Sequence, residues 1–182
     1  MQKNHVRKLV VMAMMSAISL GLFLLRFPIP GMPPNLKINI ADLPAAIISF
    51  AYGPLAGLCV CLVRNLLSFF LPGIGENSGV IGELANFCVT AMYILPMGFI
   101  YRFWKNKKGA VIALCVATVC MVITCIPINI FVMFPLYAPG MALSARFAMV
   151  MSMYVPFNLI KGVLNSLLTF ILYKHISHLI KK

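Results

Sequence analysis

The stretch "LVVMAMMSAISLGLFLL", residues 9–25, runs for 17 residues without a charged side chain. A helix needs about 20 mainly apolar residues to cross a bilayer. The stretch follows Arg7 and Lys8 and continues into "RFPIPGMPP". That continuation lacks the small-residue site at which a signal peptide is cleaved. We therefore predict a retained first membrane span over about residues 8–27.

The composition extends this prediction to the whole chain. Of its 182 residues, 62% are hydrophobic and 10% are charged, whereas soluble domains carry about 25% charged residues. A soluble fold of this length leaves too much of its surface exposed to hide so many apolar side chains. We expect one membrane domain over residues 1–182, without a soluble domain or a long linker.

Five further apolar segments follow the first one. They cover roughly residues 42–53, 55–71, 80–103, 109–134 and 156–175. The fold class we predict is an all-α integral membrane protein, a bundle of six transmembrane helices. The segment 42–53 is too short to span comfortably unless it is partly re-entrant.

The charge distribution predicts the orientation. Basic residues in short flanks of membrane spans mark the cytoplasmic side, and such flanks also contact anionic lipid, so the net charge of +12 does not indicate nucleic-acid binding. Both termini and the 102–108 loop are therefore predicted to be cytoplasmic, and the 28–41 loop to lie outside the cell. Ten of the fifteen basic residues form these flanks: Lys3, Arg7, Lys8, Arg102, Lys105, Lys107, Lys108, Lys174, Lys181 and Lys182.

Several chemistries are not expected of this chain. The six cysteines lie in apolar segments, where free cysteine packs as a small hydrophobic side chain, and no Cys/His spacing fits a zinc site. The phosphate-binding pattern G-x-x-x-x-G-K-[ST] is missing from the sequence. We predict no metal, no cofactor and no catalytic residue, so any ATP hydrolysis belongs to other chains.

Charged residues inside the spans are costly, about 2.5–3.5 kcal/mol each on insertion scales, and are therefore usually functional. In "PFNLIKGVLN" the residues Asn158, Lys161 and Asn165 recur at i, i+3 and i+7, which places them on one helical face. Because Pro156 suits the first turn of a helix, we expect Asn158 and Lys161 near its outer end.

The same spacing recurs in the fourth segment, where Glu83, Asn86 and Thr90 share a face near the outer end. Asn129 lies in the outer half of the fifth segment. These polar faces converge beneath the outer loop, which predicts a pocket suited to a planar, uncharged molecule that forms hydrogen bonds. Loop residues Lys37, Asn39 and Asp42 and aromatic walls such as Phe87, Tyr154 and Phe157 complete the predicted pocket.

Simpler interpretations stay open at this point. Lys161 and Glu83 pair across two helices in one of them, and each asparagine taken alone fits an interhelical hydrogen bond. Arg64 fits a structural role as well as a functional one. Ala13, Ala17 and Gly21 are spaced four apart, which suits either close packing within the bundle or docking of a partner helix.

The runs "FPIPGMPPNLKINIADLPAAI", "YGPLAGL", "RNLL", "GELANF" and "PFNLIKG" occur in this order. Together they resemble the riboflavin-specific S component of energy-coupling factor (ECF) transporters, the RibU family. The resemblance extends from about Arg7 to Lys174. In place of the loop pattern "LKIDFSD" this chain has Asn39 where the first acidic residue stands.

The resemblance implies a membrane subunit that captures riboflavin from outside and docks on a T component carrying two ATP-binding-cassette ATPases. It implies docking through an Ala-x-x-x-Ala motif, which Ala13 and Ala17 match. Another vitamin or a flavin such as flavin mononucleotide stays open as the ligand, and so does a structural membrane protein without one. The substrate-binding residues that the resemblance implies are Leu36, Lys37, Asn86, Asn129, Asn158 and Lys161, and from its place in the loop we add Asn39.

Overall fold

The structure is a computed structural model. It describes the backbone of residues 2–33, 36–71 and 79–181, and the side chains of residues 5–33, 36–71 and 79–173. Asn35 of the outer loop and the side chains of four predicted flanking cations lie outside these ranges. Those four cations are Lys3, Lys174, Lys181 and Lys182.

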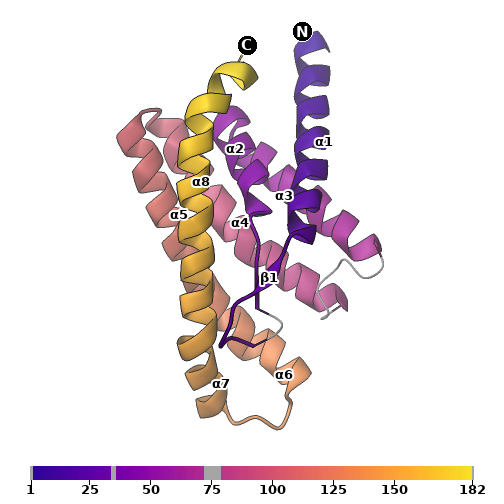
Figure 1. Ribbon diagram of the computed structural model, residues 1–182, viewed down its shortest axis with the longest axis vertical. Coiled ribbons are helices and arrows are strands. Elements are labelled where there is room, and N and C mark those ends of the chain that lie inside the picture. Colours follow the sequence, from indigo (N-terminus) through magenta and orange to yellow (C-terminus); the bar gives the residue numbers. More distant parts are fainter. Residues whose placement is uncertain (1, 34–35, 72–78, 182) are drawn as a thin grey trace.

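The described chain consists mainly of helices, with one short hairpin in the first loop (Figure 1). Both chain ends lie at the same end of the bundle, and the hairpin lies toward the other end with the α6–α7 connection. In chain order the elements are α1 (Gln2–Leu24), β1 (Phe27–Pro28), β2 (Lys37–Ile38), α2 (Asp42–Tyr52), α3 (Pro54–Phe70), α4 (Gly79–Phe103), α5 (Lys107–Ile128), η1 (Asn129–Met133), α6 (Phe134–Tyr137), α7 (Leu143–Met149), η2 (Val150–Tyr154) and α8 (Val155–Lys181).

Four helical stretches are long and apolar enough to cross a membrane: His5–Leu24, Gly79–Phe103, Lys107–Tyr137 and Leu143–Tyr173. Helix α2 has 11 residues, about 17 Å at 1.5 Å per residue, against a hydrocarbon thickness of about 30 Å. Helix α3, with 17 residues, is also shorter than a usual span. A helical membrane protein is confirmed, while the count of six crossings and the cytoplasmic termini stay predictions.

The predicted start of the last span near Pro156 is wrong, because the helical stretch begins at Leu143. The π-helical turn η2 carries the chain across the proline: the Val155 N–H donates to the carbonyl of Val150, five residues earlier. Pro156 has no N–H to donate, and a π turn changes the bonding pattern just before it. Asn158 and Lys161 therefore lie well inside a long span rather than near its outer end.

The fifth span also contains a π turn close to a proline. The Phe134 N–H donates to the carbonyl of Asn129, so the π turn η1 ends at Met133, two residues before Pro135. The helix then continues as α6 to Tyr137. The sequence-based end near Phe134 is therefore three residues too early.

The first loop folds back on itself as a hairpin. Strands β1 and β2 pair antiparallel, with Phe27 opposite Ile38 and Pro28 opposite Lys37. The Ser19 hydroxyl on α1 donates to the carbonyl of Ala41 at 2.5 Å. This bond attaches the end of the hairpin to α1, immediately before α2 begins.

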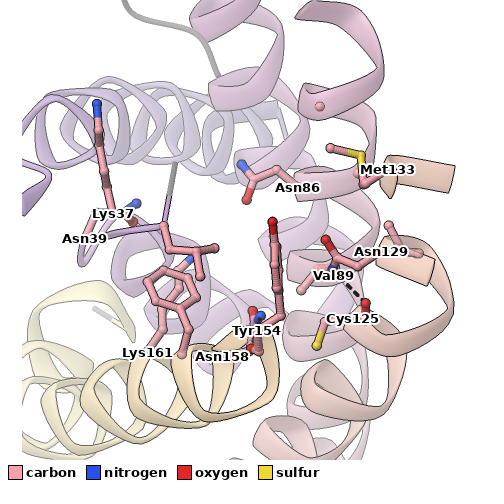
Figure 2. A pocket seen from close by; sticks show the side chains of 15 residues that line it. Lys37, Asn39, Asn86, Val89, Cys125, Asn129, Met133, Tyr154, Asn158 and Lys161 are labelled. Atoms are coloured by element: carbon pink, nitrogen blue, oxygen red, sulfur yellow. Dashed lines mark hydrogen bonds between the residues drawn. The ribbon is translucent and has the colours of Figure 1, made fainter. Parts of the chain in front are cut away.

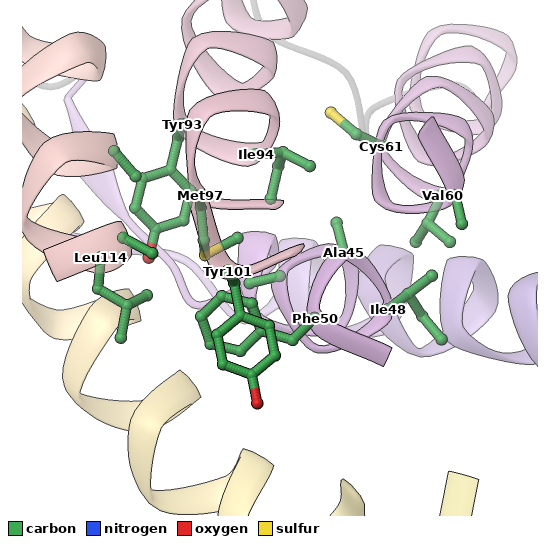
Figure 3. Packing of buried hydrophobic residues seen from close by; sticks show 14 of the residues in the cluster. Ala45, Ile48, Phe50, Val60, Cys61, Tyr93, Ile94, Met97, Tyr101 and Leu114 are labelled. Atoms are coloured by element: carbon green, nitrogen blue, oxygen red, sulfur yellow. The ribbon is translucent and has the colours of Figure 1, made fainter. Parts of the chain in front are cut away.

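The core between α2, α3, α4 and α5 combines small residues with a few large ones (Figure 3). Alanines such as Ala45, Ala113 and Ala117 are fully buried, and small residues let membrane helices approach closely. Phe50 and Tyr101 fill the space toward one end of this core, with ring centroids 4.3 Å apart. This core holds α2 against α4. It therefore fixes the position of Asp42, the first residue of α2.

We predict that Gly57→Ala lowers the stability of the protein, because helix α3 crosses α2 at this glycine. A Cβ atom on Gly57 would lie 2.6 Å from Cβ of Ser49 and 2.7 Å from the carbonyl oxygen of Ala45. Overpacking of this kind costs about 1–3 kcal/mol. Thermal unfolding in detergent measures the effect. Gly21→Ala is the matched control, since a Cβ there meets nothing within 4 Å, and equal stability of the two variants would contradict the packing argument.

Candidate substrate-binding site

All seven residues that the sequence analysis proposed for substrate binding line one recess. Figure 2 shows that the labelled ones among them come from separate parts of the chain. Three of the seven come from residues 36–39 around strand β2, which we call the hairpin arm. The others come from α4, from the π turn η1 and from α8. These residues are Leu36, Lys37 and Asn39, then Asn86, Asn129, Asn158 and Lys161.

Two asparagine amides in the recess are oriented by their own helices. Nδ2 of Asn129 donates to the carbonyl of Cys125 at 2.7 Å, and Nδ2 of Asn158 donates to the carbonyl of Tyr154 at 2.9 Å. An amide group has two donor hydrogens and an acceptor oxygen. One hydrogen of each amide is used by its helix, and the remaining capacity suits recognition of carbonyl and ring-nitrogen edges.

Aromatic and apolar side chains form the rest of the wall. Tyr154 and Phe157 line the recess, and Figure 2 shows the Tyr154 ring standing between the hairpin arm and Asn129. Phe87, which was predicted as a further wall, packs against the central core instead. The interior volume is about 120 Å³, below the roughly 300–1,000 Å³ of typical ligand sites. A ligand with fused rings therefore requires side chains or the hairpin to move.

A buried ionic cluster lies beside the recess. The Asp42 carboxylate is 2.5 Å from Nη1 of Arg64 and 3.0 Å from Nζ of Lys161. All three side chains are buried, and the Thr90 hydroxyl donates to the same carboxylate at 3.4 Å. Since buried charges are tolerated only when paired, one anion on α2 holds cations from α3 and α8.

Sequence reasoning missed the role of Asp42, which it placed in the outer loop but did not select as a site residue. The signal was available: Asp42 is the one aspartate in the chain, and two intramembrane cations need an anion. The pairing that the structure shows for Lys161 is with Asp42, not the proposed pairing with Glu83. An Oε atom of Glu83 accepts a hydrogen bond from Ser68 at 2.9 Å.

The hairpin arm is attached directly to α8. Nδ2 of Asn165 donates to the backbone carbonyl of Asn39 at 3.4 Å and to that of Lys161 at 3.0 Å. The Asn39 side chain accepts from the backbone N–H of Ala41 at 3.2 Å. Asn39 is therefore buried and shapes the turn into α2, while Lys37 on the same arm is half-buried.

On α1, Ala13, Ala17 and Gly21 are all exposed. A Cβ atom added to Gly21 would meet nothing within 4 Å. Packing within the bundle therefore does not explain this small-residue face. It lies on the outside of the described part of the molecule.

Comparison with known proteins identifies the family of this chain. Over residues 7–173 the sequence matches the family described as "ECF transporter, substrate-specific component". The chain belongs to this family. As such an S component it is a transport subunit and not an enzyme.

Its relatives are similar over most of their length. The riboflavin transporter FmnP of Bacillus subtilis (strain 168) is 38% identical over 164 residues, 87% of this chain and 85% of the relative. The riboflavin transporter RibU of Staphylococcus aureus (strain TCH60) is 35% identical over 188 aligned positions, covering 100% of this chain and 95% of the relative. The chain and these relatives therefore correspond almost end to end.

Two solved structures share the fold. One, described as "Structure and mechanism of the S component of a bacterial ECF transporter", matches with a TM-score of 0.80 and 33% identity, covering 100% of both chains. An S component for biotin matches with a TM-score of 0.68 and 18% identity, covering 96% of this chain and 94% of the other. The second likeness concerns the fold alone.

We predict that Asp42→Asn strongly destabilises the S component, because it leaves the guanidinium of Arg64 and the ammonium of Lys161 buried without their anion. Removing one partner of a buried ion pair costs about 3–5 kcal/mol. Lys161→Met is the matched comparison, since it leaves the Asp42–Arg64 pair in place. Thermal unfolding in detergent should show a larger loss for Asp42→Asn, and an unchanged midpoint for that variant would refute the shared-anion arrangement.

Proposed function

We propose that the S component captures riboflavin at the outer side of a bacterial cell membrane. The proposal rests on one observation. The seven residues that were predicted to bind substrate come from four parts of the chain and line one recess. Relatives at 35–38% identity are named riboflavin transporters, which supports the choice of ligand. The chain crosses the membrane six times in this proposal, with both termini in the cytoplasm and the hairpin outside.

The chemistry of the recess matches that of the flavin ring. The isoalloxazine system is flat and carries carbonyl oxygens and ring nitrogens at one edge. The amides of Asn129 and Asn158 bind that edge, and Tyr154 and Phe157 supply faces for stacking. Lys161 has an ammonium with three donor hydrogens, so two remain available beside the one directed at Asp42.

Binding requires the recess to enlarge. The hairpin carries Leu36 and Lys37 at the mouth, and Tyr154 stands in the middle of the space. In the proposed sequence the hairpin arm moves outward, the ring enters beside Tyr154, and Lys37 closes over the bound ligand. Enclosure of the ring removes water from its polar edge, which strengthens each hydrogen bond made there.

Transport then depends on partner chains. The S component docks through Ala13 and Ala17 on a T component that carries two ATP-binding-cassette ATPases, and reorientation of the loaded subunit delivers riboflavin inward. The exposure of this face supports docking, because small residues let a partner helix approach closely.

Flavin mononucleotide is the second candidate ligand. Two ammonium groups, those of Lys37 and Lys161, line the recess, and such groups bind phosphate. Lys161 already pairs with Asp42, which leaves Lys37 as the main partner for a phosphate. We therefore rank riboflavin first, and competition between the two flavins at equilibrium distinguishes them.

We predict that purified S component binds riboflavin and that Asn158→Leu weakens this binding about tenfold or more. Loss of the amide leaves a polar group of the ring unpaired, at a cost of about 1–3 kcal/mol, and 1.4 kcal/mol is a factor of ten in affinity. Isothermal titration calorimetry in detergent measures the dissociation constant. Ser152→Leu is the control, since this exposed residue of the same span does not line the recess.

Three outcomes separate the ligand hypotheses. Riboflavin binding that Asn158→Leu reduces and Ser152→Leu leaves unchanged supports the proposal. Tighter binding of flavin mononucleotide, lost in Lys37→Gln, transfers it to the second candidate. A preparation that binds neither flavin and none of a vitamin panel contradicts substrate capture altogether.

We predict that Ala17→Trp prevents assembly with the T component and ATPases while leaving riboflavin affinity unchanged, because a large ring keeps the partner helix away from α1. Co-purification of the tagged complex measures assembly. Ile123→Trp, at another exposed position on α5, serves as the control and should assemble normally. Normal assembly of Ala17→Trp would move the docking surface elsewhere.

A further inference from the structure

Two adjoining hollows lie along the seam between α5 and α8, away from the substrate recess. The first has a volume of about 260 Å³ and is lined by Lys105, Asn106, Lys107 and Tyr173 among others. The second, about 510 Å³, is lined almost entirely by apolar side chains of the two helices. Phe170 forms part of both walls, so the two hollows are neighbours on either side of this ring.

The apolar hollow is a groove between two helices that touch at one crossing. A Cβ atom added to Gly162 would lie 2.8 Å from Cγ2 of Thr118, so α5 and α8 are in close contact there. Around this crossing Val119, Val163 and Leu167 are all exposed. In the part of the chain that the structure describes, this groove faces away from the bundle and toward lipid.

Aromatic residues place the cationic hollow at a membrane surface. Trp104, the one tryptophan of the sequence, is exposed in the turn between α4 and α5. The hydroxyl of Tyr101 donates to that of Tyr173 at 3.0 Å. Tryptophan and tyrosine concentrate at the level of lipid headgroups. Lys105 and Lys107 therefore lie at headgroup depth, at the end of the molecule that carries both termini.

We propose that this seam is a binding site for one anionic phospholipid. The phosphate binds the ammonium groups of Lys105 and Lys107, and one acyl chain follows the groove past Phe170 along α5 and α8. The order of the two hollows supports the assignment: a cationic hollow at headgroup depth lies next to an apolar groove along the same two helices. That order matches a negative headgroup joined to a hydrocarbon chain, and basic pockets between helices at this membrane level bind such headgroups.

The test is native mass spectrometry of the full chain, purified in detergent with equal amounts of phosphatidylglycerol and phosphatidylcholine. We expect one phosphatidylglycerol to remain bound and to be preferred at least fivefold over phosphatidylcholine. The double variant Lys105→Gln/Lys107→Gln should remove that preference. Lys107→Gln alone should weaken the preference, and Lys108→Gln is its matched control: it removes one charge at the next residue, but Lys108 does not line either hollow.

Two further experiments test the lipid's acyl chain and its headgroup separately. Val163→Trp fills the groove without changing charge and should lower lipid retention at least fivefold. Glycerol 3-phosphate, which has the phosphate but no acyl chain, should not displace the lipid at millimolar concentration. Circular dichroism and riboflavin titration of each variant check the fold, since none of these residues lines the substrate recess.

Other outcomes overturn the proposal. If Lys108→Gln weakens the preference as much as Lys107→Gln does, the lipid responds to general surface charge. If glycerol 3-phosphate displaces the lipid, the site binds free anions and the groove has no part in it. If Val163→Trp leaves lipid retention unchanged and abolishes assembly with the T component, the groove is a protein interface.

Discussion

The arrangement of this S component depends on one buried carboxylate. Asp42 begins α2, where a negative charge is favoured by the helix dipole, and it binds Arg64 of α3 and Lys161 of α8. Removal of the carboxylate would leave two buried cations without their anion, which is strongly destabilising. The cluster holds α8 against α2 beside the recess. The positions of the residues that line the recess therefore depend on it.

Two prolines lie next to π turns that contribute to the recess wall. Each π turn ends just before a proline that cannot donate a hydrogen bond, and each contributes a residue to the recess wall: Asn129 begins η1 and Tyr154 ends η2. π turns are frequent at functional sites because they redirect side chains without ending the helix. Long spans thus continue past Pro135 and Pro156 while their polar groups face inward.

Helical spacing predicted part of the recess. It placed Asn158 and Lys161 on one face and Asn86 on another, because polar groups in a membrane span turn away from lipid. Spacing alone also placed Glu83, Thr90 and Asn165 on these faces, and they do not line the recess. The sequence could not show that Asp42 serves both cations, because its partners stand 22 and 119 positions away and no periodic pattern links them. Continuation past Pro156 was missed because the residue before proline usually leaves the helical conformation. Phe87 was misplaced because an aromatic residue on a mixed face fits a core as well as a pocket.

Two parts of the molecule have different chemistry: amides and rings line the recess beside the hairpin, whereas lysines and tyrosines surround the end of the α5–α8 seam nearest the termini. The central claim concerns the recess, where we propose that the Asp42 cluster supports flavin binding. An experimental structure of the riboflavin complex tests it most directly. The account predicts the flavin ring between Tyr154 and Asn129, with Lys161 still paired to Asp42. A ring bound elsewhere, or an Asp42 carboxylate without its two cations, would contradict it.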